Sequence, residues 1–589
     1  MPEKSSLSRR DFLKGAVIAG AGAATIGLTA CTSNDASGAS GGSNVITLPH
    51  VDNWDYEADV VVCGFGFAGH GATIESSNLG NSVFVVDRAI REHCGGSSAA
   101  KWIYTSALLG PDPETNIKYD TAECMGTVPD PDTIRKQIEM NHQVPAWIES
   151  IGGTVTWQPT AISYPTLPSG LDMSKSGTGS ENGFVGHPPA PYEDQYPQGS
   201  QFQPPWVQWM LDTCDQKNIP VKHATPVVEL IQNGETGEVI GIKAAEGITF
   251  DNAFNQNSDG TPIYIKAKKG VVLATGGYEH NPELLHTFAP HAHAAFVTMY
   301  GSPYSNGSGM MAAQKAGAQL WHLNKKEMHN FACAPVSKEI GVGVTVSAWA
   351  TGIGKYPGIV VNRYGQRFYN EYFNGGHSEN RREWDHMVHH LKPADDEDYL
   401  DYINVPFYFI FDDTTMKNQQ IGSHGMFQYL LGVYNWSSDN SAELAKGYIV
   451  KADTLEELGA AITSTNFWGE KEVMGDRLAK TVADYNGYCA TGVDLEFGRR
   501  ASQMLPLVTP PFYAMEICEC QTNTQGGPKH NGDCQVLDAL DQPIPRLYVA
   551  GELGSIYGCM YNGMQNIPET LSSGIRAARH INTLTAWDA

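Results

Sequence analysis

Three glycines and an aspartate form the pattern with the clearest chemical meaning in this sequence. Gly64, Gly66 and Gly69 occur as Gly-x-Gly-x-x-Gly, and Asp87 follows 23 positions after Gly64. Glycines at this spacing let the backbone approach a pyrophosphate, whose charge is met by free N–H groups and the positive end of a helix dipole. A carboxylate about 20 residues later can accept hydrogen bonds from ribose hydroxyls. The pattern predicts dinucleotide binding, without separating NAD from FAD.

The neighbouring residues supply the elements that this pattern needs. Residues 59–63 are mostly valine and predict a short buried strand, and the glycines turn out of it into a helical stretch. Residues 82–86 predict a second strand, which ends at Asp87. Strand, glycine turn, helix and second strand occur in the order of a Rossmann unit. The order matters, because a glycine-rich turn alone occurs by chance.

The same strand-then-glycine pattern returns twice further along the chain. Residues 271–273 lead into Ala274-Thr275-Gly276-Gly277, and residues 546–549 lead into Ala550-Gly551-Glu552 and a helix from Pro568 to Ile581. Between these two places the pattern is lost and aromatic residues cluster. We therefore expect an α/β nucleotide-binding domain in two segments, 54–284 and 506–589, with an α+β capping domain inserted at 285–505.

Together with Gly95-Gly96-Ser97-Ser98, these motifs resemble the flavoprotein-subunit family of fumarate reductase and succinate dehydrogenase, which includes the 3-ketosteroid dehydrogenases. The resemblance runs from about Asp59 to the C-terminus and implies a Rossmann-like FAD-binding domain. No histidine lies between Gly95 and Thr105, where some members attach the flavin covalently, so it implies non-covalent FAD. The cofactor-binding residues that it implies are Gly64, Gly66, Ala68, Gly69, Asp87, Arg88, Gly96, Ser97, Ser98, Thr275, Gly276, Gly551 and Glu552.

The substrate pocket departs from the dicarboxylate enzymes of that family. His329 keeps register with a substrate-binding histidine of the fumarate reductases. Gly375, however, stands where those enzymes hold a proton-donating arginine, and Asn523 replaces a second pocket histidine. Tyr561 stands where another arginine is expected. Because two carboxylates need such cations for bidentate recognition, these replacements argue against fumarate as the substrate.

Two tyrosines resemble those of the ketosteroid dehydrogenases instead. Tyr561 falls where that branch has a tyrosine that hydrogen-bonds a substrate ketone, and Tyr164 matches another tyrosine of its FAD domain. The resemblance does not place the proton donor, for which Tyr372 and His377 are candidates. Each tyrosine also has a structural interpretation as a loop or packing residue, and His329 as a buried, satisfied histidine.

The expected reaction is hydride transfer from flavin N5 to an activated C=C bond of a small enone or enoate. Tyr561 would stabilise the charge that develops on the carbonyl oxygen, helped by Tyr164, with His329 as a polar substrate contact. Dehydrogenation of the 3-ketosteroid type and reduction of a fumarate-type dicarboxylate remain alternatives. The non-enzyme alternative is a flavin lipoprotein that only carries electrons.

The first residues predict an export signal. Ser8-Arg9-Arg10-Asp11-Phe12-Leu13-Lys14 and the weakly apolar stretch after it indicate a twin-arginine signal over residues 1–31. Residues 28–31 resemble a lipobox, in which Cys31 becomes a lipid anchor, and cleavage without lipid is equally open. Residues 32–53 read as a flexible tether. The expected location is periplasmic or cell-surface, with or without that anchor.

Composition narrows the possible partners. Lys and Arg number 39 against 64 Asp and Glu, and the resulting net charge of −25 argues against nucleic acid. The 11 cysteines contain no C-x-x-C pair, and we expect no metal site. Relatives with their own haem or FMN domain carry it in extra sequence, whereas only a tether precedes Trp54. We therefore expect an external electron-transfer protein, either a cytochrome or a flavoprotein.

Overall fold

The computed structural model describes most of the chain from residue 51 onward. The described residues are 51, 53–100, 105–109, 112–158, 169, 183–190, 192, 204–289, 297–299, 301–324, 326–340, 355–371, 391–393, 400–422, 434–466, 469–558 and 566–589.

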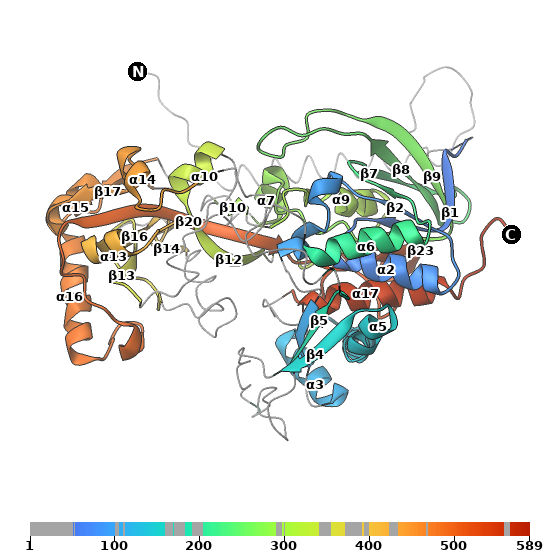
Figure 1. Ribbon diagram of the computed structural model, residues 1–589, viewed down its shortest axis with the longest axis horizontal. Coiled ribbons are helices and arrows are strands. Elements are labelled where there is room, and N and C mark those ends of the chain that lie inside the picture. The colour runs from blue at the N-terminus through green and yellow to red at the C-terminus, as the bar shows by residue number, and fades with distance from the viewer. Residues whose placement is uncertain are drawn as a thin grey trace, which may run out of the picture. The chain divides into compact units, whose positions relative to one another are not determined.

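The largest sheet joins the two ends of this part of the chain (Figure 1). Strand β1 (Tyr56–Cys63) pairs in parallel with β2 (Val83–Val86) on one side and β9 (Thr261–Leu273) on the other. Strand β23 (Pro543–Val549) continues the sheet beyond β9, again in parallel. The sheet is completed by β22 (Gln535–Leu537), β6 (Val221–Lys222), β7 (Val227–Gln232) and β8 (Val239–Glu246). This arrangement confirms the predicted α/β class.

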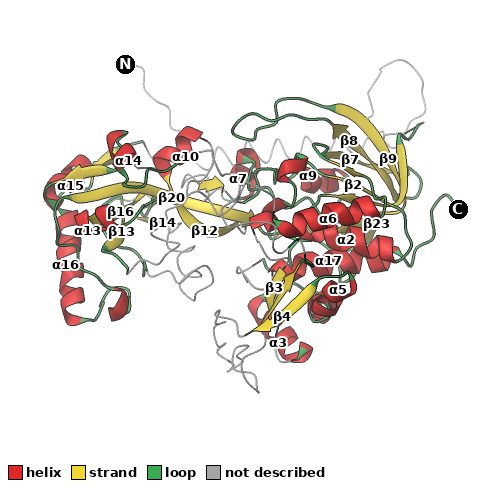
Figure 2. Ribbon diagram, viewed as in Figure 1, coloured by secondary structure: helices red, strands yellow, loops and turns green. Residues whose placement is uncertain are grey.

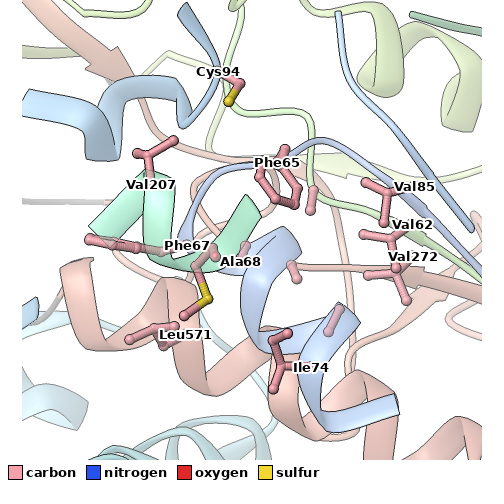
Figure 3. Close-up of a cluster of buried hydrophobic side chains, with 14 of the residues drawn as sticks. Val62, Phe65, Phe67, Ala68, Ile74, Val85, Cys94, Val207, Val272 and Leu571 are labelled. Atoms are coloured by element: carbon pink, nitrogen blue, oxygen red, sulfur yellow. The ribbon is translucent and has the colours of Figure 1, made fainter. Parts of the chain in front are cut away.

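Strand β1 is apolar throughout its second half because both faces of the sheet are covered. Val60 and Val62 pack into a cluster on one face, and Val61 and Cys63 into a cluster on the other. The first cluster draws on several helices, and Figure 3 labels side chains from three of them. These helices are α2 (Phe67–Asn78), α6 (Pro205–Gln216) and α17 (Asn566–Ile581).

Helices α2 and α17 lie almost backbone to backbone. A Cβ at Gly574 would lie 2.2 Å from the carbonyl oxygen of Ala68, and a Cβ at Gly71 would lie 2.6 Å from that of Leu571. A larger residue at either position would push the helices apart. This close packing ties the helix that follows the glycine turn to the C-terminal end of the chain.

A second sheet is organised around the long strand β20 (Phe512–Thr524), as Figure 2 shows in yellow. Residues 512–517 pair with β16 (Phe407–Asp412), and β13 (Gly358–Asn362) lies beyond it. Residues 517–524 pair with β12 (Lys326–Cys333), and residues 519–521 also pair with β10 (Val297–Met299). Strand β17 (Val450–Ala452) pairs with the start of β20. One strand therefore belongs to the cap core and also reaches the cofactor region.

Apolar side chains fill both faces of the cap sheet. Ile359 and Ile410 pack with helices α15 (Leu455–Ala461) and α16 (Arg477–Thr491), whereas Val360 and Phe409 pack on the opposite face.

The other elements are η1 (Arg91–His93), η2 (Gly96–Ala100), β3 (Thr105–Leu108), α3 (Pro113–Glu123), α4 (Pro131–Asn141), α5 (Val144–Ser150), β4 (Thr154–Gln158), β5 (Gly183–His187), α7 (Pro282–Phe288), α9 (Ser308–Lys315), β11 (Leu320–Trp321), α10 (Ala334–Ile340), β14 (Leu391–Pro393), β15 (Leu400–Tyr402), α13 (Asp413–Asn418), α14 (Ser441–Ala445), β18 (Thr463–Thr465), β19 (Lys471–Val473), η4 (Ala501–Gln503) and β21 (Gly527–Pro528).

Within the ranges given above, no helix is both long enough and apolar enough to cross a bilayer. The residue limits of the predicted domains stay predictions. So do the signal, the lipobox and the tether, because residues 1–50 lie outside the described part of the chain.

Candidate functional site

The glycine turn between β1 and α2 forms one wall of a cavity. Gly64 has φ +111°, and a Cβ there would lie 2.2 Å from the carbonyl oxygen of Ala274, at the end of β9. A Cβ at Gly69 would lie 2.0 Å from the carbonyl oxygen of Gly64. Gly66 differs, because the nearest atom to its Cβ position is 3.5 Å away. Gly64 and Gly69 therefore permit close packing, whereas a Cβ at Gly66 would make only ordinary van der Waals contacts, with Gly95 and Ser98.

The cavity lies beyond the carboxyl ends of the parallel strands β1, β2, β9 and β23, where ligands of such sheets bind. It holds about 740 Å³ of space, part of it open to solvent. All the predicted cofactor-binding residues except Gly69 line it, namely Gly64, Gly66, Ala68, Asp87, Arg88, Gly96, Ser97, Ser98, Thr275, Gly276, Gly551 and Glu552. Three separate stretches of sequence thus meet in one place.

Polar atoms in this cavity lack hydrogen-bond partners within the described structure. They are the Oδ2 atom of Asp87, the Nε atom of Arg88 and the Oγ1 atom of Thr275. A buried polar atom without a partner is costly, so a ligand that supplies one is favoured. An adenine dinucleotide fits this set, because its ribose hydroxyls can donate to Asp87 and its pyrophosphate can accept from Arg88. The orphaned atoms therefore fit FAD.

The start of helix α2 adds a site for negative charge. No side chain caps the helix at its N-cap residue Gly66, and the N–H of Phe67 lies 3.5 Å from the hydroxyl of Ser98. The helix runs for 12 residues and points its positive end at the cavity. Arg88 adds a cation here, since its guanidinium stacks 4.9 Å from the ring centroid of Phe250. Burial lowers its pKa to about 10, which still leaves it charged at neutral pH.

Two buried carboxyl groups flank the Gly276-Gly277 turn. Glu552 Oε1 accepts the N–H of Gly277 at 2.8 Å. Glu279 Oε2 accepts the hydroxyl of Thr524 at 3.3 Å. Burial raises the pKa of Glu552 to about 7 and that of Glu279 well above its usual range, and the charge of Glu552 adds to the second effect. Burial therefore disfavours the charged form of both carboxyls.

The end of β20 carries a row of buried amides that the sequence analysis missed, apart from Asn523. Gln521, Asn523 and Gln525 are 1%, 5% and 0% exposed. The Oε1 of Gln521, the Oδ1 of Asn523 and both polar atoms of Gln525 have no partner in the described part of the chain. The row lies beside the cofactor cavity, because the Asn523 amide is hydrogen-bonded to Glu552. Its polar spacing at every second residue was visible in the sequence.

Of the predicted catalytic residues, the structure describes only the backbone of His329. The pairing of β12 with β20 is irregular at His329, because Met328 pairs with Gln521 and Asn330 with Cys520, so the register skips His329 of β12 and Thr522 of β20. The backbone of His329 therefore lies next to the start of the amide row. Tyr164, Tyr372, His377 and Tyr561 lie outside the described residues.

Comparisons with known proteins agree with this geometry. Digoxin reductase from Eggerthella lenta is 25% identical, over 99% of this chain and 98% of its own. The acrylate reductase flavoprotein subunit from Shewanella woodyi is 25% identical, over 98% of this chain and 99% of its own. A solved structure of 3-ketosteroid delta1-dehydrogenase from Sterolibacterium denitrificans matches with a TM-score of 0.67 at 21% identity, covering 90% of this chain and all of that one.

The model of the FAD binding domain family matches residues 59–567. The match spans the first glycine motif, the whole cap and the Gly551-Glu552 motif, and it confirms the family resemblance that these motifs predicted. Because it covers most of the chain, the protein belongs to this FAD-binding family and is an FAD-dependent oxidoreductase.

Proposed function

We propose that this protein is an exported reductase that saturates an activated C=C bond of a small, neutral carbonyl compound. The observation that carries this proposal is the row of buried amides Gln521, Asn523 and Gln525 beside the cofactor cavity, each of which has an amide oxygen without a partner in the described part of the chain. Amides can donate to and accept from a neutral carbonyl or hydroxyl group, but they bring no charge to balance a pair of carboxylates. The names of two relatives, digoxin reductase and acrylate reductase, support a reductive direction.

In this proposal the residues of the chain have the following roles. Bound FAD supplies hydride transfer, and the cavity from Gly64 to Glu552 holds it. Tyr561 donates a hydrogen bond to the substrate carbonyl oxygen and so stabilises the negative charge that develops there. Tyr164 assists it, and His329 makes a further polar contact. Tyr372 or His377 protonates the neighbouring carbon.

The second half of the proposal concerns the source of the electrons and the location of the protein. The twin-arginine pattern around Arg9 and Arg10 supports export to the periplasm or cell surface, with Cys31 as the lipid-anchor site. A separate cytochrome or flavoprotein supplies the electrons. The relative from Shewanella woodyi supports this division, because its name makes it one subunit of a reductase.

The test is an anaerobic substrate screen with the FAD-loaded protein and reduced viologen as the donor. We expect at least one neutral enone to oxidise the viologen, with kcat/KM about 100-fold above that for fumarate, or about 2.7 kcal/mol. If no alkene oxidises the donor, the proposal fails. Oxidation of a 3-ketosteroid with an artificial acceptor, in the absence of any reductase activity, would assign the dehydrogenase function instead.

Replacing Tyr561 with phenylalanine tests the oxyanion assignment. We expect the kcat of the best substrate to fall by about 10- to 1,000-fold, because one transition-state hydrogen bond is lost. The flavin absorbance should not change. Tyr56→Phe is the matched control, since Tyr56 is 37% exposed on β1, and it should keep the full rate. Equal rates for the two variants would contradict the role of Tyr561.

A further inference from the structure

The segment that follows Glu552 is held by two consecutive aromatic residues. The indole N–H of Trp321 donates to the carbonyl oxygen of Gly554 at 3.2 Å. Nδ1 of His322 lies 2.8 Å from the next carbonyl oxygen, that of Ser555. The two rings stack, with centroids 4.4 Å apart and planes 9° from parallel. This stacked pair therefore fixes two successive peptide groups of the segment.

The same segment is fixed from its other side by helix α17. Glu569 accepts the hydroxyl of Ser555 at 2.7 Å and the N–H of Ile556 at 2.9 Å. Glu569 is only 2% exposed, and burial raises its pKa to about 7. Ser555 is thus held at its carbonyl by His322 and at its hydroxyl by Glu569.

The imidazole of His322 also shapes the path of the chain. A Cβ at Gly558 would lie 2.2 Å from Cγ of His322, so only glycine fits against the ring. His322 itself has φ +59°, in the left-handed region that few residues other than glycine adopt. The backbone is strained in order to bring the ring to this place. Such strain points to a role beyond packing.

Both ring nitrogens of His322 face groups that can only accept hydrogen bonds. Nε2 lies 3.1 Å from the carbonyl oxygen of Thr127, opposite the 2.8 Å contact to Ser555. Burial lowers the pKa of His322, whereas the two carbonyl contacts act in the opposite direction. We assign a proton to Nδ1, because the contact to Ser555 is the shorter of the two.

We propose that His322 is a positioning residue, whose Nδ1–H holds the Ser555 carbonyl and thereby fixes the segment Ser555–Gly558 that leads to Tyr561. The inference rests on the proposed function, in which Tyr561 is the oxyanion donor. Tyr561 follows Gly558 by three positions in the sequence. Displacements of about 1 Å cost up to about 100-fold in rate.

Two isosteric variants test this role. His322→Asn puts an amide N–H where Nδ1 stands, whereas His322→Asp has the same shape but only acceptor oxygens at pH 8. Both residues tolerate the left-handed backbone, and neither side chain reaches Thr127 as the Nε2 atom does. The two variants therefore have the same shape but differ in the bond to Ser555 and in the negative charge of the aspartate. The readouts are hydrogen exchange of residues 555–558 by mass spectrometry and, separately, kcat, KM and flavin content.

We expect His322→Asn to match the wild type within about twofold in exchange, and His322→Asp to exchange about 10-fold faster. The aspartate variant should also lose about 10- to 100-fold in kcat, with KM and flavin content unchanged. Equal exchange in the two variants would overturn the proposal, as would faster exchange with an unchanged kcat. If exchange differs while no acceptor supports turnover by the wild type, the proposed function fails and the hydrogen bond to Ser555 stands.

Discussion

Replacing Gly64 with alanine should give a protein that contains little or no FAD. The new Cβ would lie 2.2 Å from the carbonyl oxygen of Ala274 and 2.7 Å from its carbonyl carbon. Both are backbone atoms at the end of β9, so β9 has to move away from β1. The φ of +111° adds a strain of about 1–2 kcal/mol for any residue with a side chain. We expect the flavin-to-protein ratio of the purified variant to fall at least 10-fold, roughly 1.4 kcal/mol or more.

Gly80 provides the matched control. It also has a positive φ, of +88°, but nothing lies within 4 Å of its Cβ position. Gly80→Ala should therefore lose about 1 kcal/mol of folding stability through backbone strain alone, and it should keep its flavin. The visible absorbance of the two purified variants checks the difference. If both retained flavin equally, the crowding at Gly64 would not be what requires glycine there.

Replacing Arg367 with methionine should destabilise the cap by about 3–5 kcal/mol. Its guanidinium contacts Glu371 through two bonds of 2.6 Å and Asp494 through bonds of 2.9 and 3.2 Å. The side chains of Arg367, Glu371 and Asp494 are fully buried. Methionine fills similar volume but removes the guanidinium that pairs with buried Asp494 and leaves buried Glu371 with only Arg499, at 3.7 Å. The measurement is the free energy of unfolding from urea titration followed by near-UV circular dichroism.

Lys480→Met is the control for this variant. Lys480 lies 2.7 Å from Asp484 on helix α16 of the same cap, but its side chain is 78% exposed. An exposed pair of this kind contributes about 0.5 kcal/mol or less. A loss below about 1 kcal/mol in Arg367→Met would contradict the importance that the structure gives to this buried network.

The cofactor cavity could be predicted because its signals are local. The run from Gly64 to Gly69 had to form a turn, and Asp87 had to end the next strand, whatever the rest of the chain did. The structure brings these residues together with Gly551 around one cavity. Gly69 is the exception, since it allows the helix to approach Gly64 and does not line the cavity. The individual FAD contacts stay predictions.

The amide row could not be predicted, because its burial depends on strands far apart in sequence. Glu519, Gln521, Asn523 and Gln525 alternate at the period of a strand, a pattern that usually marks a face in contact with water. Here that end of β20 is enclosed by β10 and β12, from about 200 residues earlier. Only this pairing turns an apparently exposed face into a buried one.

The ends of individual helices also could not be predicted from the periodic pattern of the sequence. The sequence between Asp132 and Ile151 has the period of one helix, but the structure divides it into α4 and α5. Pro145 lacks the N–H that would continue the ladder to Asn141, so the chain restarts at Val144. The catalytic roles of Tyr561, Tyr164, Tyr372 and His377 rest on family resemblance, and the geometry of these residues lies outside the described ranges.

The position of β20 and β23 near the C-terminus sets when the chain can fold during synthesis. Strand β16 needs β20 as a neighbour, and β9 needs β23, so each sheet keeps an open edge until residues 512–549 have left the ribosome. Open edges expose unpaired N–H and C=O groups that promote aggregation. Neither sheet can be completed while the nascent chain is still short. Both sheets are complete only when translation is nearly over.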